Sequence, residues 1–243
     1  MDGILRCTRY AFGPNRLHYC GPDVNSEIGA YLEHGSSDPG LEHLLKQFQN
    51  MYPYLKHIAS ANHIRDHFDD RVVEAYWIGN ALLENTEKRT LYNHFVNDRK
   101  ITKKMGKKDF SHITGKIASG AVPHHSFHVF DVWKRANTLG LENTLEVIDE
   151  CRISWGKVTK IDGPYVYAEI ESLAYRDGKL FLDKPIVKKL ARRLESEYDI
   201  EQMKAGDLIT IHWSVPCEVI SQKQLAMLKH YTLKHLVLAN QTL

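Results

Sequence analysis

Apolar residues follow two different periods along this chain. Before about residue 97 they recur with helical spacing, as in Leu41, Leu44, Leu45 and Phe48 at positions i, i+3, i+4 and i+7. Beyond about residue 150 they alternate with polar residues in short runs, as in residues 165–170 (YVYAEI). The change of period predicts an α+β fold, with an α-rich domain over residues 1–148 and a β-rich domain over residues 149–243.

Capping residues and prolines divide the helical part into separate elements. Asp38 with Pro39 is typical of a helix start, and Gly35 is typical of a helix end. Turn-forming residues dominate residues 1–23, which we expect to be irregular. Helices are expected from Asn25 or Ser26 to Gly35, from Pro39 to Pro53, from Tyr54 to Ile64, after Asp69 or Asp70 as far as Ala81, and from Thr86 to Val96.

The second part of the chain has a residue pattern typical of short antiparallel strands joined by tight turns. Strands are expected at residues 152–161, 165–170, 180–182, 207–213 and 217–220, with turns at 162–164 and 177–178. Pro185 begins an expected amphipathic helix with Ile186, Val187, Leu190 and Leu194 inward. Ser221 is expected to cap a terminal helix. Short strands with these helices predict a small closed β-barrel followed by a C-terminal helix.

Composition narrows the choice of partners and compartment. The chain has 243 residues, with 32 basic and 30 acidic side chains and a formal net charge of +2. Such a balance gives no reason to expect nucleic acid or a membrane surface as a partner. Residues 98–119 are basic and polar, with pairs at Arg99-Lys100, Lys103-Lys104 and Lys107-Lys108, and are expected to be a solvated surface or a contact for an acidic partner. Four widely spaced cysteines and no secretory signal predict reduced thiols and a cytoplasmic protein.

Histidines gather in residues 123–133 (PHHSFHVFDVW). Aromatic and β-branched residues favour a strand from about Phe127, and His124 and His128 then share one face, as they also would in a helix. With His125, and with Cys20 before its Gly-Pro bend, these side chains form a candidate site for a cofactor: a metal, a haem, or acid–base groups. The alternatives are histidines hydrogen-bonded at a domain junction and a structural, buried Cys20. The absence of an H-E-x-x-H motif argues against a zinc protease.

Two later stretches carry a resemblance. Residues 151–163 (CRISWGKVTKIDG) and 204–212 (KAGDLITIH) resemble the two signatures of the HypC/HupF family of [NiFe]-hydrogenase maturation chaperones. The resemblance implies an OB-like barrel in which Cys151 and His212 hold an iron as the Fe(CN)2(CO) unit. Its implied partners are hydrogenase maturation proteins or the hydrogenase large subunit. The chain departs from the family because Cys151 is internal, Trp155 replaces a proline, and Trp213 follows the histidine. The first 150 residues resemble uncharacterised proteins encoded near hydrogenase genes.

These observations lead to one hypothesis and three rivals. The leading hypothesis is a metal-centre assembly factor, with Cys151 as soft ligand and His212 as second ligand or proton-handling neighbour. The first rival is an iron- or haem-dependent enzyme that acts on a small molecule at His124 and His128, with Cys20 or His18, and uses the barrel only as a scaffold or lid. A third possibility places both sites across one interdomain cleft. The last is an interaction module without metal, in which Cys151 is an ordinary buried residue and His212 a hydrogen-bonded strand histidine. No catalytic residue is assigned.

Overall fold

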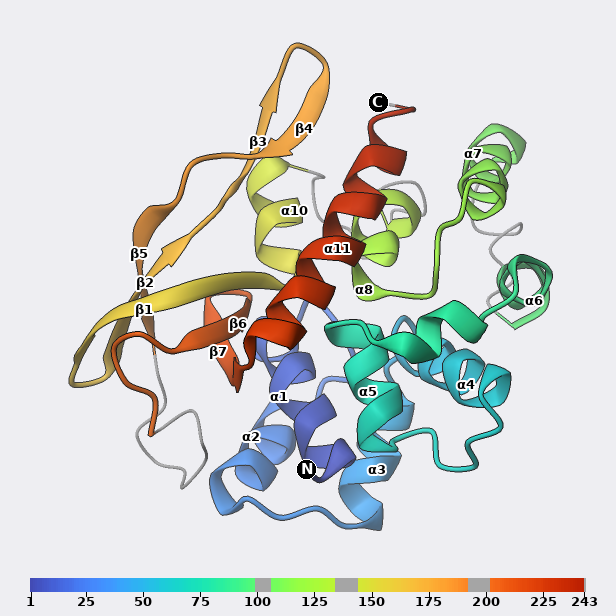
Figure 1. Ribbon diagram of the computed structural model, residues 1–243. Helices are drawn as coiled ribbons and strands as arrows, with labels where there is room; N and C mark the ends of the chain where they lie inside the picture. Colours follow the sequence, from blue (N-terminus) through green and yellow to red (C-terminus); the bar gives the residue numbers. More distant parts are fainter. Residues whose placement is uncertain (99–105, 134–143, 192–201, 243) are drawn as a thin grey trace.

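Helices and one principal sheet share the fold. A computed structural model describes residues 1–98, 106–133, 144–191 and 202–242 (Figure 1). The expected α+β class is confirmed. Figure 1 shows the strands on one side of the long helix α11 (Gln222–Ala239), with the N-terminal helices packed below it. Among the described residues, no helix is long and apolar enough to cross a membrane.

The first half of the chain is helical. Local signals place most of its helices: Asp38 accepts a hydrogen bond from the Leu41 N–H and Pro39 opens the helix, while Gly35 ends the one before it at φ +61°. The elements are α1 (Gly3–Asn15), α2 (Asn25–His34), α3 (Pro39–Lys46), α4 (Tyr52–Ala61), α5 (Asp70–Trp77), the 3₁₀ turn η1 (Ala81–Asn85), α6 (Lys88–Asn93), the π-helical turn η2 (His94–Asp98) and α7 (Lys107–Ala118).

Helix α1 corrects the expectation that residues 1–23 are irregular. Asp2 caps it by accepting a hydrogen bond from the Leu5 N–H, and its buried face carries Cys7, Tyr10 and Ala11 at helical spacing. Pro14 lies in the last turn, where loss of one N–H does not break the helix. The turn formers thus mark the end of a helix rather than its absence.

The histidine-rich segment is also helical, which corrects the expected strand. It forms α8 (His125–Phe127) and the π-helical turn η4 (His128–Trp133). The His124 side chain caps this turn by accepting a hydrogen bond from the Ser126 N–H. Residues 121–132 are buried without a break, and an apolar run buried on every side does not distinguish a strand from a helix by its period.

The sheet is antiparallel, with the strand order β5-β2-β1-β6-β7. Its strands are β1 (Ser154–Asp162), β2 (Tyr165–Ile170), β5 (Ile186–Ala191), β6 (Leu208–His212) and β7 (Val215–Ile220). Strands β3 (Leu173–Arg176) and β4 (Lys179–Leu182) form a separate hairpin, with the expected turn at Asp177 and Gly178, both at positive φ.

The expected closed barrel is wrong, because the described strands form an open sheet that ends at β5 and β7. Helix α1 covers β6 and β7 in its place. The Tyr10 hydroxyl lies 2.9 Å from the Thr210 hydroxyl and donates to the Glu218 carboxylate at 2.5 Å, and Arg6 pairs with the same carboxylate at 3.1 Å. A face sealed by a helix does not need the sheet to close on itself.

The helix expected from Pro185 is wrong as well. Ile186 to Ala191 is strand β5, paired with β2 so that Ile186 lies opposite Ile170. Only Leu190 of this strand is deeply buried. Leu194 and the rest of the expected helix lie outside the described residues, as does the basic stretch at 99–105.

Along the chain, helix α10 (Leu145–Cys151) precedes the sheet and helix α11 follows it. The expected Ser221 cap is confirmed and forms a capping box with Gln224. One apolar cluster joins both halves of the chain, since Trp155, Cys217 and Tyr231 pack in it with residues from the N-terminal helices. The division at residue 148 stays a prediction, and the core is continuous across it.

Candidate metal centre

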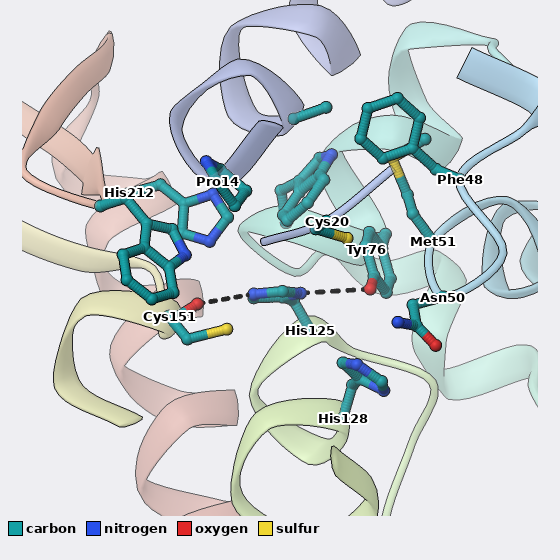
Figure 2. A pocket seen from close by; sticks show the side chains of 13 residues that line it. Pro14, Cys20, Phe48, Asn50, Met51, Tyr76, His125, His128, Cys151 and His212 are labelled. Carbon is teal, nitrogen blue, oxygen red and sulfur yellow. Dashed lines mark hydrogen bonds between the residues drawn. The ribbon is translucent and has the colours of Figure 1, made fainter. Parts of the chain in front are cut away.

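Three distant segments bring a thiol and two imidazoles together. His125 belongs to α8, Cys151 is the last residue of α10, and His212 is the last residue of β6. One ligand atom from each lies within 4.8 Å of the other two, and all three residues are buried. Figure 2 shows the three side chains around one pocket. Cys151 and His212, paired in the sequence analysis, are therefore neighbours in space, with His125 as a third member.

The end of helix α1 fixes the orientation of His212. Its Nδ1–H donates to the Tyr10 carbonyl at 2.7 Å. In a regular helix that carbonyl would accept from the N–H of residue 14, but residue 14 is a proline and has none. Gly13 completes the arrangement, because a Cβ there would lie 2.6 Å from the His212 carbonyl oxygen. Gly13 and Pro14 thus allow α1 to hold the His212 ring closely.

The turn after His212 is strained. Trp213 and Ser214 form the two-residue connection between β6 and β7 and have φ values of +51° and +58°. Such values suit a tight hairpin but are uncommon for a bulky side chain. The Trp213 N–H donates to the Glu150 carbonyl at 3.0 Å, and its ring packs on Tyr19 at a centroid distance of 4.7 Å. These contacts fasten the His212 turn to the end of α10, beside Cys151.

Hydrogen bonds assign the ring protons. A carbonyl can only accept, so His212 carries its proton on Nδ1, and its Nε2 keeps a lone pair. This Nε2 is buried and has no hydrogen-bond partner of good geometry among the described residues. The His125 ring lies between the Cys151 carbonyl, 2.8 Å from Nε2, and the Tyr76 hydroxyl, 3.1 Å from Nδ1. Whichever His125 nitrogen binds a metal, the other keeps a hydrogen bond that holds the ring, as is usual around metal sites.

Burial controls the charge of all three groups. It lowers the pKa of His212 to about 4, against a smaller opposing effect of its backbone partners at Tyr10 and Cys151. It lowers the pKa of His125 well below the ordinary value, and His212 and His128 lower it further. It raises the pKa of the Cys151 thiol, as does the neighbouring Cys20. The imidazoles are therefore neutral and ready to ligate, while a metal must displace the thiol proton.

The three residues face a small apolar cavity of about 30 Å³. A water molecule needs roughly 10–15 Å³ by the same measure, so the cavity has room for an ion and a small ligand. Its wall is mostly apolar, with His128, Asn50 and the Tyr76 hydroxyl as additional polar groups. The lining residues are Ala11, Pro14, Cys20, Phe48, Asn50, Met51, Tyr76, Trp77, His125, His128, Cys151, His212 and Trp213 (Figure 2).

A wider hollow opens beside this cavity on the protein surface. It has a volume of about 670 Å³ and is lined by residues 18–22, Lys46, Gln47, Gln49 and Asn50. Cys20 and Asn50 line both the hollow and the inner cavity. The two spaces are therefore neighbours that share these side chains.

Comparison with known proteins gives a family but no activity. A family profile described as a family of unknown function (DUF6390) matches residues 1–243. The chain belongs to this family. No curated protein and no solved structure is significantly similar to it. The DUF6390 match extends over both halves of the chain, so all three site residues lie within the matched region.

Not every predicted site residue of this DUF6390 chain lies at the cavity. His125, His128 and Cys20 line it together with Cys151 and His212. His124 does not: its ring stacks on Tyr231 and His235 of α11. The expectation that His124 and His128 share a face is therefore wrong, because His124 is the capping residue and its side chain turns back onto its own helix start.

Sequence reasoning also missed groups that complete the site. The Tyr76 hydroxyl, the Asn50 side chain and the Tyr10 carbonyl come from helices and loops with no motif to mark them. The partner of the Tyr76 hydroxyl, His125, lies 49 positions away along the chain. Pro14 was the one local signal, since a proline inside a helix always leaves a carbonyl without its helical donor.

Proposed function

We propose that this DUF6390 protein binds one transition-metal ion through His125, Cys151 and His212 and acts in the assembly of a metal centre. The observation that supports this best is the meeting of the three ligand atoms within 4.8 Å at a buried cavity. Burial keeps both imidazoles neutral, and His212 Nε2 has no hydrogen-bond partner of good geometry among the described residues. A structural role alone would not require an unused lone pair beside a thiol.

The donor set indicates the class of metal. One thiolate and two imidazoles suit Zn, Cu or Fe rather than the oxygen-seeking Mg or Ca. In a bound tetrahedral site, ligand atoms about 2.0–2.3 Å from the metal lie roughly 3.5 Å apart. The three groups therefore need only a small approach to close on an ion.

Within the part of the chain that the structure describes, no fourth ligand joins the three, and this favours transient metal handling over a structural metal site. Structural zinc sites have four protein ligands, while sites with three leave a position for water, substrate or a partner's ligand. In this protein the open position faces the apolar cavity and, beyond Cys20 and Asn50, the outer hollow. A metal held there can exchange ligands with a second molecule.

Iron as part of an Fe(CN)2(CO) unit is the proposed cargo, on the resemblance of residues 151–163 and 204–212 to the HypC/HupF signatures. The proposed partners are hydrogenase maturation proteins or the hydrogenase large subunit. The apolar wall suits uncharged diatomic ligands, and the Asn50 amide and Tyr76 hydroxyl offer donors to a cyanide nitrogen. Three diatomic ligands need more room than the cavity has, so part of such a unit would extend toward the outer hollow. A haem is far larger than the cavity, so the proposal is for an ion.

The second candidate is an iron-dependent enzyme acting on a small molecule at the same cavity. It is favoured by His128 and the Tyr76 hydroxyl, which line the cavity and could exchange protons with a bound molecule. The two candidates differ in the fate of the metal. An enzyme keeps its iron through many reaction cycles, whereas an assembly factor releases it to a partner.

Metal analysis with an infrared spectrum on anaerobically purified protein tests the proposal. We expect one iron per chain with cyanide and carbonyl bands in the wild type, and loss of both in Cys151→Ser, which keeps the side-chain size and removes the soft donor. His43→Gln, which changes an exposed histidine of α3, is the matched control and should keep both. Iron without the bands would favour the enzyme. Metal retained in full by Cys151→Ser would contradict both candidates.

A further inference from the structure

Cys20 stands where the inner cavity and the outer hollow meet. It lines both spaces and is partly exposed, whereas Cys151 is buried. It is not a member of the three-ligand group of His125, Cys151 and His212. Figure 2 shows the Cys20 sulfur among the side chains around the cavity. A soft donor is thus placed at the mouth of a candidate metal site but outside its ligand set.

The loop that carries Cys20 is held in place by specific contacts. The buried Asn15 side chain donates to the Cys20 carbonyl at 2.9 Å and to the Pro22 carbonyl at 2.8 Å. Gly21 has a φ of +88°, and a Cβ there would lie 2.3 Å from the Phe48 ring. On the other side, Tyr19 packs on Trp213. Both aromatic supports, Phe48 and Trp213, also line the inner cavity, so the loop is fitted to its mouth.

We propose that Cys20 is a transfer ligand, which receives a metal ion in the outer hollow and passes it to His125, Cys151 and His212. This inference rests on the proposed function. Two independent observations carry it: a thiol shared by both spaces, and the buried His212 Nε2, which has no hydrogen-bond partner of good geometry among the described residues and belongs to a residue lining the inner cavity.

Desolvation explains why such a ligand is useful. A hydrated divalent ion loses much hydration free energy if it sheds its waters before it enters an apolar cavity. Stepwise exchange avoids this. In the hollow a metal–water bond breaks as the bond to Cys20 Sγ forms, and the thiol proton passes to solvent. In the cavity the bond to Cys20 Sγ breaks as the bond to Cys151 Sγ forms, and the Cys151 proton passes to the departing Cys20 thiolate. No electron is transferred in either step.

Stopped-flow mixing of Co²⁺ with the reduced full-length protein tests the proposal. The sulfur-to-cobalt absorption band reports loading, and its loss on addition of EDTA reports release. We expect Cys20→Ser to bind one Co²⁺ with an affinity within about threefold of wild type, because the ligand set is intact. Loading and release should both be at least about tenfold slower, the size of effect usual for groups around a metal site. Gln47→Ala, an exposed change in the outer hollow, is the control and should match wild type.

The possible failures are separable. Equal rates in wild type and Cys20→Ser, with binding that still depends on Cys151, would overturn the role of Cys20 and leave the proposed function standing. An affinity loss in Cys20→Ser as large as that in Cys151→Ser would make Cys20 a permanent ligand and would also overturn it. Absence of Co²⁺ binding in the wild type would overturn the proposed function, and the transfer role with it.

Discussion

Two adjacent histidines lead into two different buried clusters. His124 turns toward α11 and joins Ser126 and His235, while His125 turns toward the sheet and joins Cys151 and His212. Both clusters are buried and rich in neutral imidazole. They differ in whether a ring nitrogen keeps a lone pair that could bind a metal.

The cluster on α11 keeps no free lone pair on a ring nitrogen. His124 Nδ1 accepts from the Ser126 N–H at 3.1 Å, so the ring proton is on His124 Nε2, which has no hydrogen-bond partner of good geometry among the described residues. The Ser126 hydroxyl lies 2.8 Å from His124 Nδ1 and 2.7 Å from His235 Nδ1, and His235 Nε2 accepts from the Val122 N–H at 3.2 Å. Both ring nitrogens of His235 are thus used to fasten residues 122–126 to α11. This cluster has a structural role.

The cluster at the sheet keeps a free lone pair on His212, although both ring nitrogens of His125 have hydrogen-bond partners. Only one nitrogen of His212 has a hydrogen-bond partner of good geometry among the described residues, and the residue lines the cavity together with Cys151. Burial and histidine content therefore do not by themselves identify a metal site. A lone pair that has no partner and faces a space does.

Cys151→Ser should abolish the metal site and leave the α11 cluster intact. Because the thiolate is the soft donor, we expect the affinity for Co²⁺ or Zn²⁺ to fall by at least about 100-fold, the upper range seen for changes around metal sites. The unfolding free energy of the metal-free protein should change little. Competition with a chelating indicator measures the affinity, and urea unfolding measures the stability. An unchanged affinity would contradict the assignment.

Ser126→Ala should have the reverse effect. Removing the hydroxyl leaves the buried Nδ1 of His235 without its partner, whereas His124 Nδ1 keeps the Ser126 N–H. The expected cost is about 1–3 kcal/mol of unfolding free energy. Metal affinity should stay within about threefold of wild type, as for sites that do not interact. The same two measurements apply. A large loss of affinity with unchanged stability would show that the clusters are not separate.

The α11 cluster should also make the protein sensitive to acid. Burial lowers the pKa of His235 well below its ordinary value, and the neighbouring His124, Lys234 and His230 lower it further. The unfolded chain therefore binds a proton below about pH 6.5 that the folded chain refuses. Stability is complete above that pH and falls by up to about 1.4 kcal/mol per pH unit below it.

His235→Asn removes this contribution, and urea unfolding between pH 7.5 and 5.5 detects it. We expect the unfolding free energy of the variant to depend less steeply on pH than that of wild type, whatever its absolute stability. Equal slopes would show that His235 is not held neutral by the fold.

Pro14→Ala should loosen the metal site only slightly. The restored N–H of residue 14 would compete with His212 for the Tyr10 carbonyl, so we expect metal affinity to fall by up to about tenfold. Helix α1 gains a hydrogen bond, so the unfolding free energy of the protein should not fall. Pro39→Ala, at the first turn of α3, is the matched control and should not change the affinity. An unchanged metal affinity in Pro14→Ala would show that α1 does not orient His212 for metal binding.

Local signals made much of the fold predictable. Asp38 with Pro39 and Ser221 with Gln224 determine helix starts within a few residues, and the Asp177–Gly178 turn determines a hairpin. The histidine-rich segment and β5 were misassigned for physical reasons. One is buried on all sides and has no readable period, and the other has an Ile-Val-Lys-Lys pattern that fits a helix face or an edge strand.

The site was predictable only in parts. Cys151 and His212 were paired through a resemblance, and His125 was noticed through its neighbours in the sequence. Nothing in the sequence shows that they meet, because α8, α10 and β6 come together through tertiary packing. The same holds for Asn50 and Tyr76, which no local pattern distinguishes from ordinary core and loop residues.

X-ray absorption at the zinc edge of the Zn²⁺-loaded protein measures the ligand set of the site directly. We expect one sulfur at about 2.3 Å and two imidazole nitrogens at about 2.0–2.1 Å from the metal. The sulfur shell should be lost in Cys151→Ser. A shell of nitrogen and oxygen alone in the wild type, or a spectrum that Cys151→Ser leaves unchanged, would contradict this ligand set.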